Sequence, residues 1–144
     1  MRALKSFEEF IEDGVVKKIT IDKERAKSLI LEAERKYGSL QEILKKMGIR
    51  DENSNDYIEY CYNILMLMIR ARMFEGGYTS SGQGAHEAEV SFTRKLGFNE
   101  TQIIFLDQLR YFRNGILYYG KRFDKEYAEK VISFTEKIYK KIKL

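Results

Sequence analysis

The sequence predicts an all-α fold, a single-domain bundle of four to five main helices. Proline is absent from the 144 residues, and apolar side chains recur in long segments with a period near 3.6. Hydrophobic residues make up 44% of the chain and charged residues 33%, a balance that favours one folded core over a disordered chain. Because no repeat or linker-like tract divides the sequence, residues 1–144 are expected to form one domain.

Capping residues and glycines set the expected helix boundaries. The expected helices cover residues 5–12, 22–36, 39–47, 56–74, 85–96, 99–119 and 124 onward. Gly38 is expected to end the second helix, and Ser39 with Glu42 forms the capping-box pattern that would start the third. A strand-like alternation occurs at residues 15–21. Residues 56–74 are apolar nearly all round, which predicts the central helix of the bundle.

Two segments between the helices are expected to be connections. IRDENSND, residues 49–56, is polar. GGYTSSGQG, residues 76–84, is rich in glycine and is expected to be flexible. It lacks the Gly-Lys-Ser/Thr ending of a phosphate loop and follows a helix rather than a strand, so a nucleotide site is not expected there.

The second half of the chain carries clear start signals for helices. Asn99 and Gln102 form a second capping-box pattern, and Asp124 is expected to cap the last helix. The last helix ends in lysines, which suit the negative end of a helix dipole.

The composition argues against several kinds of site and location. No apolar run approaches the ~20 residues needed to span a bilayer. Acidic residues also occur within residues 1–10, where a signal peptide needs an apolar run, so a cytoplasmic protein without membrane association is expected. The single cysteine, Cys61, permits no internal disulfide and is expected to be a buried, unreactive thiol. With His86 as the single histidine, no metal or cofactor is expected.

Positive charge is concentrated in the second half of the chain. The formal net charge is +4, and residues 76–144 hold 12 basic and 8 acidic side chains. Between residues 110 and 122 there is no acid, but there are four cations: Arg110, Arg113, Lys121 and Arg122. A local positive field of this kind attracts phosphates.

The same region contains the segment LRYFRNGILYYG, residues 109–120. On a helix, Arg110, Asn114 and Tyr118 fall on one stripe, with Arg113 beside it. Arginine is suited to bidentate phosphate binding, and tyrosine can stack on a base. The alternative is structural: the arginines would pair with acids of neighbouring helices, and the tyrosines would belong to the core.

Three features, in this order along residues 56–123, together resemble the HEPN superfamily of small nucleotide-associated helical bundles. They are the aromatic-rich helix DYIEYCYNILMLMIRARMFEGGY, the Gly-Ala-His sequence at residues 84–86, and LRYFRNGILYYG. The resemblance implies a homodimer or heterodimer in which the motif helices face each other in a cleft. It further implies one of three activities: metal-independent RNA cleavage, partnership with a small nucleotidyltransferase in a toxin–antitoxin pair, or binding without catalysis.

By this resemblance, Arg113 matches the motif arginine, Asn114 the polar residue after it, and Tyr118 the position of the motif histidine. A phenol titrates near 10 and an imidazole near 6.5, so only about one phenol in a thousand is ionised at pH 7. Tyr118 would therefore be a poor general base. The family's tyrosine two places further on falls on Gly120, and His86 is the one available substitute histidine.

These observations support three hypotheses. The first is a dimeric HEPN-like domain with weak or no catalysis, which binds a partner such as a small nucleotidyltransferase, or binds nucleotide or RNA phosphate. Its binding residues would be Arg110, Arg113, Asn114, Tyr118, Lys121 and Arg122. The second is a toxin-like, metal-independent ribonuclease that uses Arg113, Tyr118 and His86. The third is a structural adaptor bundle in which the motif forms core or dimer interface.

Overall fold

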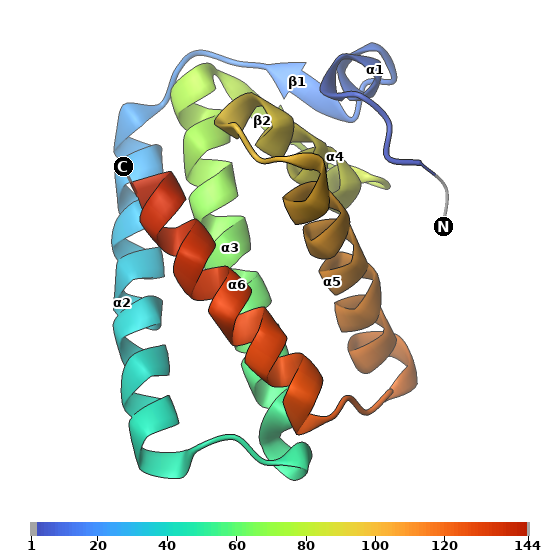
Figure 1. Ribbon diagram of the computed structural model, residues 1–144. Helices are drawn as coiled ribbons and strands as arrows, with labels where there is room; N and C mark the ends of the chain where they lie inside the picture. Colours follow the sequence, from blue (N-terminus) through green and yellow to red (C-terminus); the bar gives the residue numbers. More distant parts are fainter. Residues whose placement is uncertain (1–2, 144) are drawn as a thin grey trace.

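The computed structural model describes residues 3–143, and helices account for most of them (Figure 1). The helices are α1 (Phe7–Glu12), α2 (Lys23–Met47), α3 (Ser54–Gly76), α4 (Ala85–Phe92), α5 (Glu100–Tyr119) and α6 (Lys125–Lys143). Two 3-10 turns, Asp51–Asn53 and Thr93–Leu96, and two short strands, β1 (Val16–Lys18) and β2 (Tyr78–Ser80), are the remaining elements. The predicted all-α fold is confirmed, with α2, α3, α5 and α6 as its long helices.

Helix α3 lies at the centre of the bundle, between α2 and α6 on one side and α5 on the other (Figure 1). Fourteen of its 23 residues are buried, as its nearly all-round apolar pattern predicts. Cys61 is among them, and burial raises the pKa of its thiol to about 12, which keeps the thiol protonated and unreactive. Neither α3 nor any other helix within residues 3–143 is long and apolar enough to cross a membrane.

Helix α2 runs without interruption through Gly38, so the predicted break between two helices near residue 38 is wrong. The inward side of α2 carries Ala33, Tyr37 and Leu40, which pack into the core beside α3. The Tyr37 ring also stacks on the ring of Tyr139 in α6, with centroids 3.8 Å apart. Packing on both sides of residue 38 offsets the roughly 1 kcal/mol that a glycine costs within a helix.

A short antiparallel pair of strands closes one end of the bundle (Figure 1). Val16 pairs with Ser80 and Lys18 with Tyr78, so the strand-like alternation after residue 15 does form a strand. Its partner lies in the segment that was expected to be a flexible connection. Gly77 makes the turn into β2 with φ of 81°, and a Cβ there would lie 2.9 Å from the Ile19 carbonyl oxygen. Glycine is therefore required at this position.

The expected caps are present at the N-terminal starts of α5 and α6. The side chains of Asn99 and Gln102 form the predicted capping box at the start of α5. Asp124 accepts a hydrogen bond of 2.9 Å from the Tyr127 amide at the start of α6, as predicted. At the other end of α6, the Arg72 guanidinium donates to the backbone carbonyl of Ile142. This last contact ties the end of α6 to α3.

Candidate functional site

The two motif arginines face the interior of the bundle. The guanidinium carbon of Arg113 lies 5.1 Å from the centroid of the Tyr62 ring in α3. Its Nε atom is buried and has no hydrogen-bond partner among the described residues. Arg110 donates from Nε to Asp107 of the same helix at 2.9 Å, and both side chains are largely buried. The structural interpretation of the motif predicted a pair with an acid of a neighbouring helix, whereas Arg110 pairs with an acid of its own helix.

Charged groups of three helices surround the buried phenol of Tyr62. The pKa of Tyr62 is raised to about 12, mainly by burial and to a smaller degree by the carboxylate of Glu89 in α4. The guanidinium groups of Arg113, Arg110 and Arg70 act in the opposite direction, because positive charge favours the ionised phenol. Tyr62 is therefore the point at which charges of α3, α4 and α5 converge.

His86 belongs to this same network through its partner on α4. Its Nδ1 atom lies 2.9 Å from Oε1 of Glu89, one turn further along the helix. The other carboxylate oxygen of Glu89 accepts from Nε of Arg70 at 2.5 Å. The Glu89 side chain is only 4% exposed, whereas His86 is about half exposed. The arrangement fixes the orientation of the imidazole and leaves its edge at the surface.

A groove lies on the other side of α5, where that helix ends and the connection to α6 begins. Its volume is about 580 Å³. Its polar lining consists of Asn114, Lys121 and Arg122, and its aromatic lining includes Tyr111 and Tyr119. No carboxylate is among the described residues that line it. The groove therefore combines positive charge, an amide and aromatic rings.

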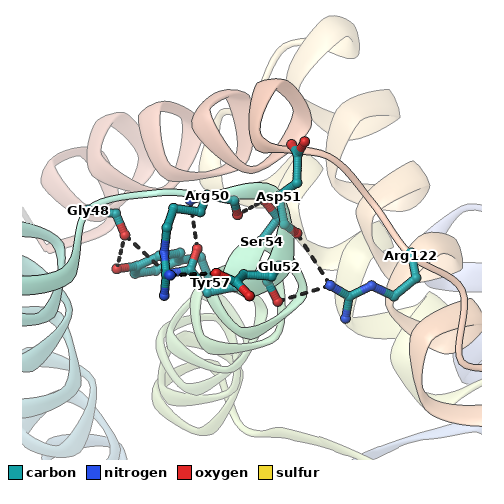
Figure 2. Close-up of polar contacts among 8 residues, drawn as sticks. Gly48, Arg50, Asp51, Glu52, Ser54, Tyr57 and Arg122 are labelled. Atoms are coloured by element: carbon teal, nitrogen blue, oxygen red, sulfur yellow. Dashed lines mark hydrogen bonds and ion pairs between the residues drawn. The ribbon is translucent and has the colours of Figure 1, made fainter.

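The Lys121–Phe123 wall of the groove is anchored to the start of α3. The buried side chain of Asn55 donates from Nδ2 to the Lys121 carbonyl at 2.8 Å and accepts from the Phe123 amide at 3.0 Å. Figure 2 shows Arg122 reaching from this connection to the turn before α3. There it donates to the backbone carbonyl of Glu52 at 2.9 Å. These contacts hold the Lys121 and Arg122 backbone in place beside α5.

Tyr118 belongs neither to the charged residues around Tyr62 nor to the lining of the groove. Five residues along a helix correspond to a rotation of about 500°, which places Tyr118 about 140° around α5 from Arg113. Its side chain is 74% exposed, and those of its neighbours Leu117 and Tyr119 are 47% and 80% exposed. Of the residues predicted to bind nucleotide or RNA, the structure brings together Asn114, Lys121 and Arg122 in the groove. Within one chain it does not bring Tyr118 to Arg113.

The residues that organise these sites were not singled out from the sequence. Tyr62 and Arg70 lie within the apolar segment that predicts the core helix, and Glu89 sits within a run of buried residues. A signal does exist for Glu89: an acid that faces the core requires a buried cation as its partner. Asn55 gave no such signal, because it lies in the polar segment at residues 49–56, which was expected to be a connection.

Within residues 3–143, no group of three or more histidine, cysteine, aspartate or glutamate side chains is placed to hold a metal ion. Comparisons of the chain with protein-family models, with curated proteins and with solved structures found no match.

Proposed function

We propose that this chain is a helical domain that binds single-stranded RNA through the groove at the end of α5. The observation that carries the proposal is the lining of that groove, in which two cations and an amide lie beside aromatic rings with no carboxylate among them. The positive charge would attract the phosphate backbone, and the rings would offer stacking surfaces to the bases. This combination is typical of proteins that bind single strands with little sequence preference.

Each lining residue has a role in this proposal. Lys121 and the guanidinium nitrogens of Arg122 that do not face Glu52 would contact phosphate oxygens. The Asn114 amide can donate to a phosphate or to a base edge. Tyr119 is 80% exposed, so its ring is free to stack on a base. Stacking of this kind is worth ~1–3 kcal/mol per base.

The groove contains no group suited to proton transfer near pH 7. Its lining has neither a histidine nor a carboxylate, and His86 is held by Glu89 on another helix. We therefore propose binding with weak or no catalysis. The alternative is a metal-independent ribonuclease, and it would need Arg113, Tyr118 and His86 to meet across two copies of the chain.

A second candidate function is docking of a protein at the same end of α5. Three large side chains, Leu117, Tyr118 and Tyr119, are exposed in this last turn of the helix. Exposed apolar side chains that gather in one place can mark interaction sites. A second copy of the chain or a small nucleotidyltransferase-type protein would be a candidate partner. Sedimentation velocity of wild type and Tyr118→Asp tests the first of these, because a dimer formed through these side chains should dissociate in the variant.

RNA binding is tested by fluorescence anisotropy with a labelled single-stranded RNA, measured over a range of salt concentrations in EDTA. Lys121→Ala is expected to weaken binding and to reduce the salt dependence, because one phosphate contact is lost. Tyr119→Ala should weaken binding about tenfold, in line with the loss of one stacked base. Tyr118→Ala is the matched control, since this neighbouring tyrosine is similarly exposed but does not line the groove.

Equal loss in the Tyr118→Ala and Tyr119→Ala variants, or no loss in either, would count against the groove as the binding site. The same samples, resolved on a gel, report on the ribonuclease alternative. Cleavage by wild type but not by Arg113→Ala would favour catalysis over binding alone.

A further inference from the structure

A second polar cavity lies at the opposite end of the bundle, beside the strand pair. Its volume is about 270 Å³, and it is bounded by the start of α2, the end of α3, β2 and α4. Its lining includes Arg25 of α2, Arg70 of α3, and the hydroxyl-bearing residues Thr79 and Ser80 of β2. Apolar walls are provided by residues such as Met73 and Phe74. Two arginines from different helices thus line one small space.

Arg25 has no ion-pair partner within the described part of the chain. Its guanidinium carbon lies 4.4 Å from the centroid of the Phe74 ring, which positions the group by a cation–π contact. Arg25 also lies in the first turn of α2, where the helix dipole disfavours positive charge. The helix itself therefore gives no reason for a cation at this position, whereas a bound anion would.

Arg70 is held in a fixed orientation by the buried Glu89. One carboxylate oxygen of Glu89 accepts from Nε of Arg70 at 2.5 Å, and the other lies 2.9 Å from Nδ1 of His86. The carboxylate that lines the cavity is therefore already neutralised by its own partners. With Arg25 added, the cavity lining carries a net charge of about +1, which favours an anion.

We propose that this cavity binds the phosphate group of a phosphate monoester between Arg25 and Arg70, with the hydroxyls of Thr79 and Ser80 as further donors. Arginine pairs and hydroxyl groups are the donors best matched to phosphate oxygens. The volume lies slightly below the ~300–1,000 Å³ that is typical of ligand sites, so it suits a phosphate with a small body. The apolar walls would contact that body. This proposal does not depend on RNA binding by the groove at the other end of the molecule.

The phosphate could belong to a small molecule or to the 5′ end of an RNA, and two sets of probes distinguish these sources. Phenyl phosphate represents the small molecule. A trinucleotide with a 5′ phosphate, compared with the same trinucleotide bearing a 5′ hydroxyl, represents the RNA end. Binding is followed by NMR, with the backbone amides of Thr79 and Ser80 as local reporters. Amides of Lys121 and Arg122 report separately on the groove, so failure of one site is distinguishable from failure of the other.

Wild type is expected to show saturable shifts at residues 79–80 with phenyl phosphate. Arg25→Ala should weaken this binding at least tenfold and leave the fold intact, because Arg25 is exposed and unpaired among the described residues. Thr79→Val, which keeps the shape but removes the hydroxyl, should weaken it less. Arg35→Ala is the matched control: this arginine lies on the same helix and pairs with Glu32.

Two results would overturn the proposal. One is the absence of saturable shifts at residues 79–80 with every probe, and the other is equal binding by Arg25→Ala and Arg35→Ala. Binding of phenyl phosphate alone would assign the site to a small phosphorylated molecule. Binding of the 5′-phosphorylated trinucleotide, but not of its hydroxyl form, would assign it to an RNA end.

Discussion

The guanidinium of Arg113 lies over the ring of Tyr62, with 5.1 Å between the guanidinium carbon and the ring centroid. The contact joins the motif helix α5 to the central helix α3. Tyr62 is almost fully buried, so Arg113 also covers the surface of the core at this point. The residue that the motif pattern predicts as a phosphate ligand therefore has a packing role.

Arg113→Ala is expected to lower the free energy of unfolding by about 1–2 kcal/mol, through loss of the cation–π contact and of the aliphatic cover over Tyr62. Because Arg113 does not line the groove, RNA affinity should change less than in Lys121→Ala. Urea unfolding and RNA anisotropy on the same preparations measure both quantities. If Arg113→Ala kept the free energy of unfolding of wild type but lost much of its RNA affinity, Arg113 would instead be a direct phosphate ligand.

The stability of the protein should fall in alkaline solution. The pKa of Tyr62 is raised from 10.0 to about 12, mainly by burial and to a smaller degree by Glu89. The folded state then holds the phenolic proton more tightly than the unfolded state, so this contribution is complete below pH 10 and is lost as the pH rises towards 12. The expected slope approaches about 1.4 kcal/mol per pH unit.

Urea unfolding over the range from about pH 8 to 11 measures this slope. Tyr62→Phe should show a shallower fall, because it keeps the ring beneath Arg113 and removes the ionisable hydroxyl. Cys61→Ala should also flatten the curve, since burial raises the pKa of that thiol from 9.0 to about 12. Parallel curves for wild type and both variants would contradict the prediction.

Glu89→Gln should destabilise the fold. The change removes the negative charge that pairs with Arg70 and puts an amide NH2 in place of one of the two carboxylate oxygens that contact Arg70 and His86. Breaking a buried ion pair costs roughly 3–5 kcal/mol, but Arg70 is partly exposed and can regain water, so we expect about 2 kcal/mol. Glu89→Gln, Arg70→Met and the double variant form a double-mutant cycle, and thermal and urea unfolding measure the stability of each. Strictly additive losses of unfolding free energy would show that Glu89 and Arg70 are not coupled.

Asn55→Ala should loosen the groove as well as the fold. Asn55 makes two hydrogen bonds to the connection between α5 and α6, and removing them leaves the Lys121 carbonyl and the Phe123 amide without partners. We expect a loss of about 2 kcal/mol in unfolding free energy and weaker RNA binding. Asn63→Ala, an exposed asparagine of the same helix, is the control. Weaker binding in both variants alike would argue against a role of the anchored connection.

The helical fold was predictable because its signals are local. The capping box at Asn99 and the cap at Asp124 formed as predicted, since each depends on residues three positions away. The continuous path of α2 through Gly38 was not predictable from local rules. It depends on packing with α3 and on the stacking of Tyr37 against Tyr139, a residue about a hundred positions distant in the sequence.

The site was predictable only in part, for the same reason. Helical spacing and charge marked Asn114, Lys121 and Arg122, which the structure places together in one groove. The separation of Arg113 from Tyr118 follows from their spacing of five residues on a helix. The spacing could not reveal that Arg113 packs over Tyr62, which is a contact between α5 and α3.

Gly115→Ala offers a test that separates binding from stability. Gly115 lies within α5, where alanine is favoured over glycine by about 1 kcal/mol. The added Cβ would lie 3.3 Å from Cδ of Lys121, a flexible side chain that can move away. We therefore expect unchanged or higher stability together with weaker RNA binding, because Lys121 is displaced from the groove.

Gly38→Ala is the matched control: a Cβ there meets nothing within 4 Å, so stability should rise while RNA affinity stays the same. Equal RNA affinity in both variants, measured by anisotropy beside urea unfolding, would mean that the position of Lys121 does not matter for binding.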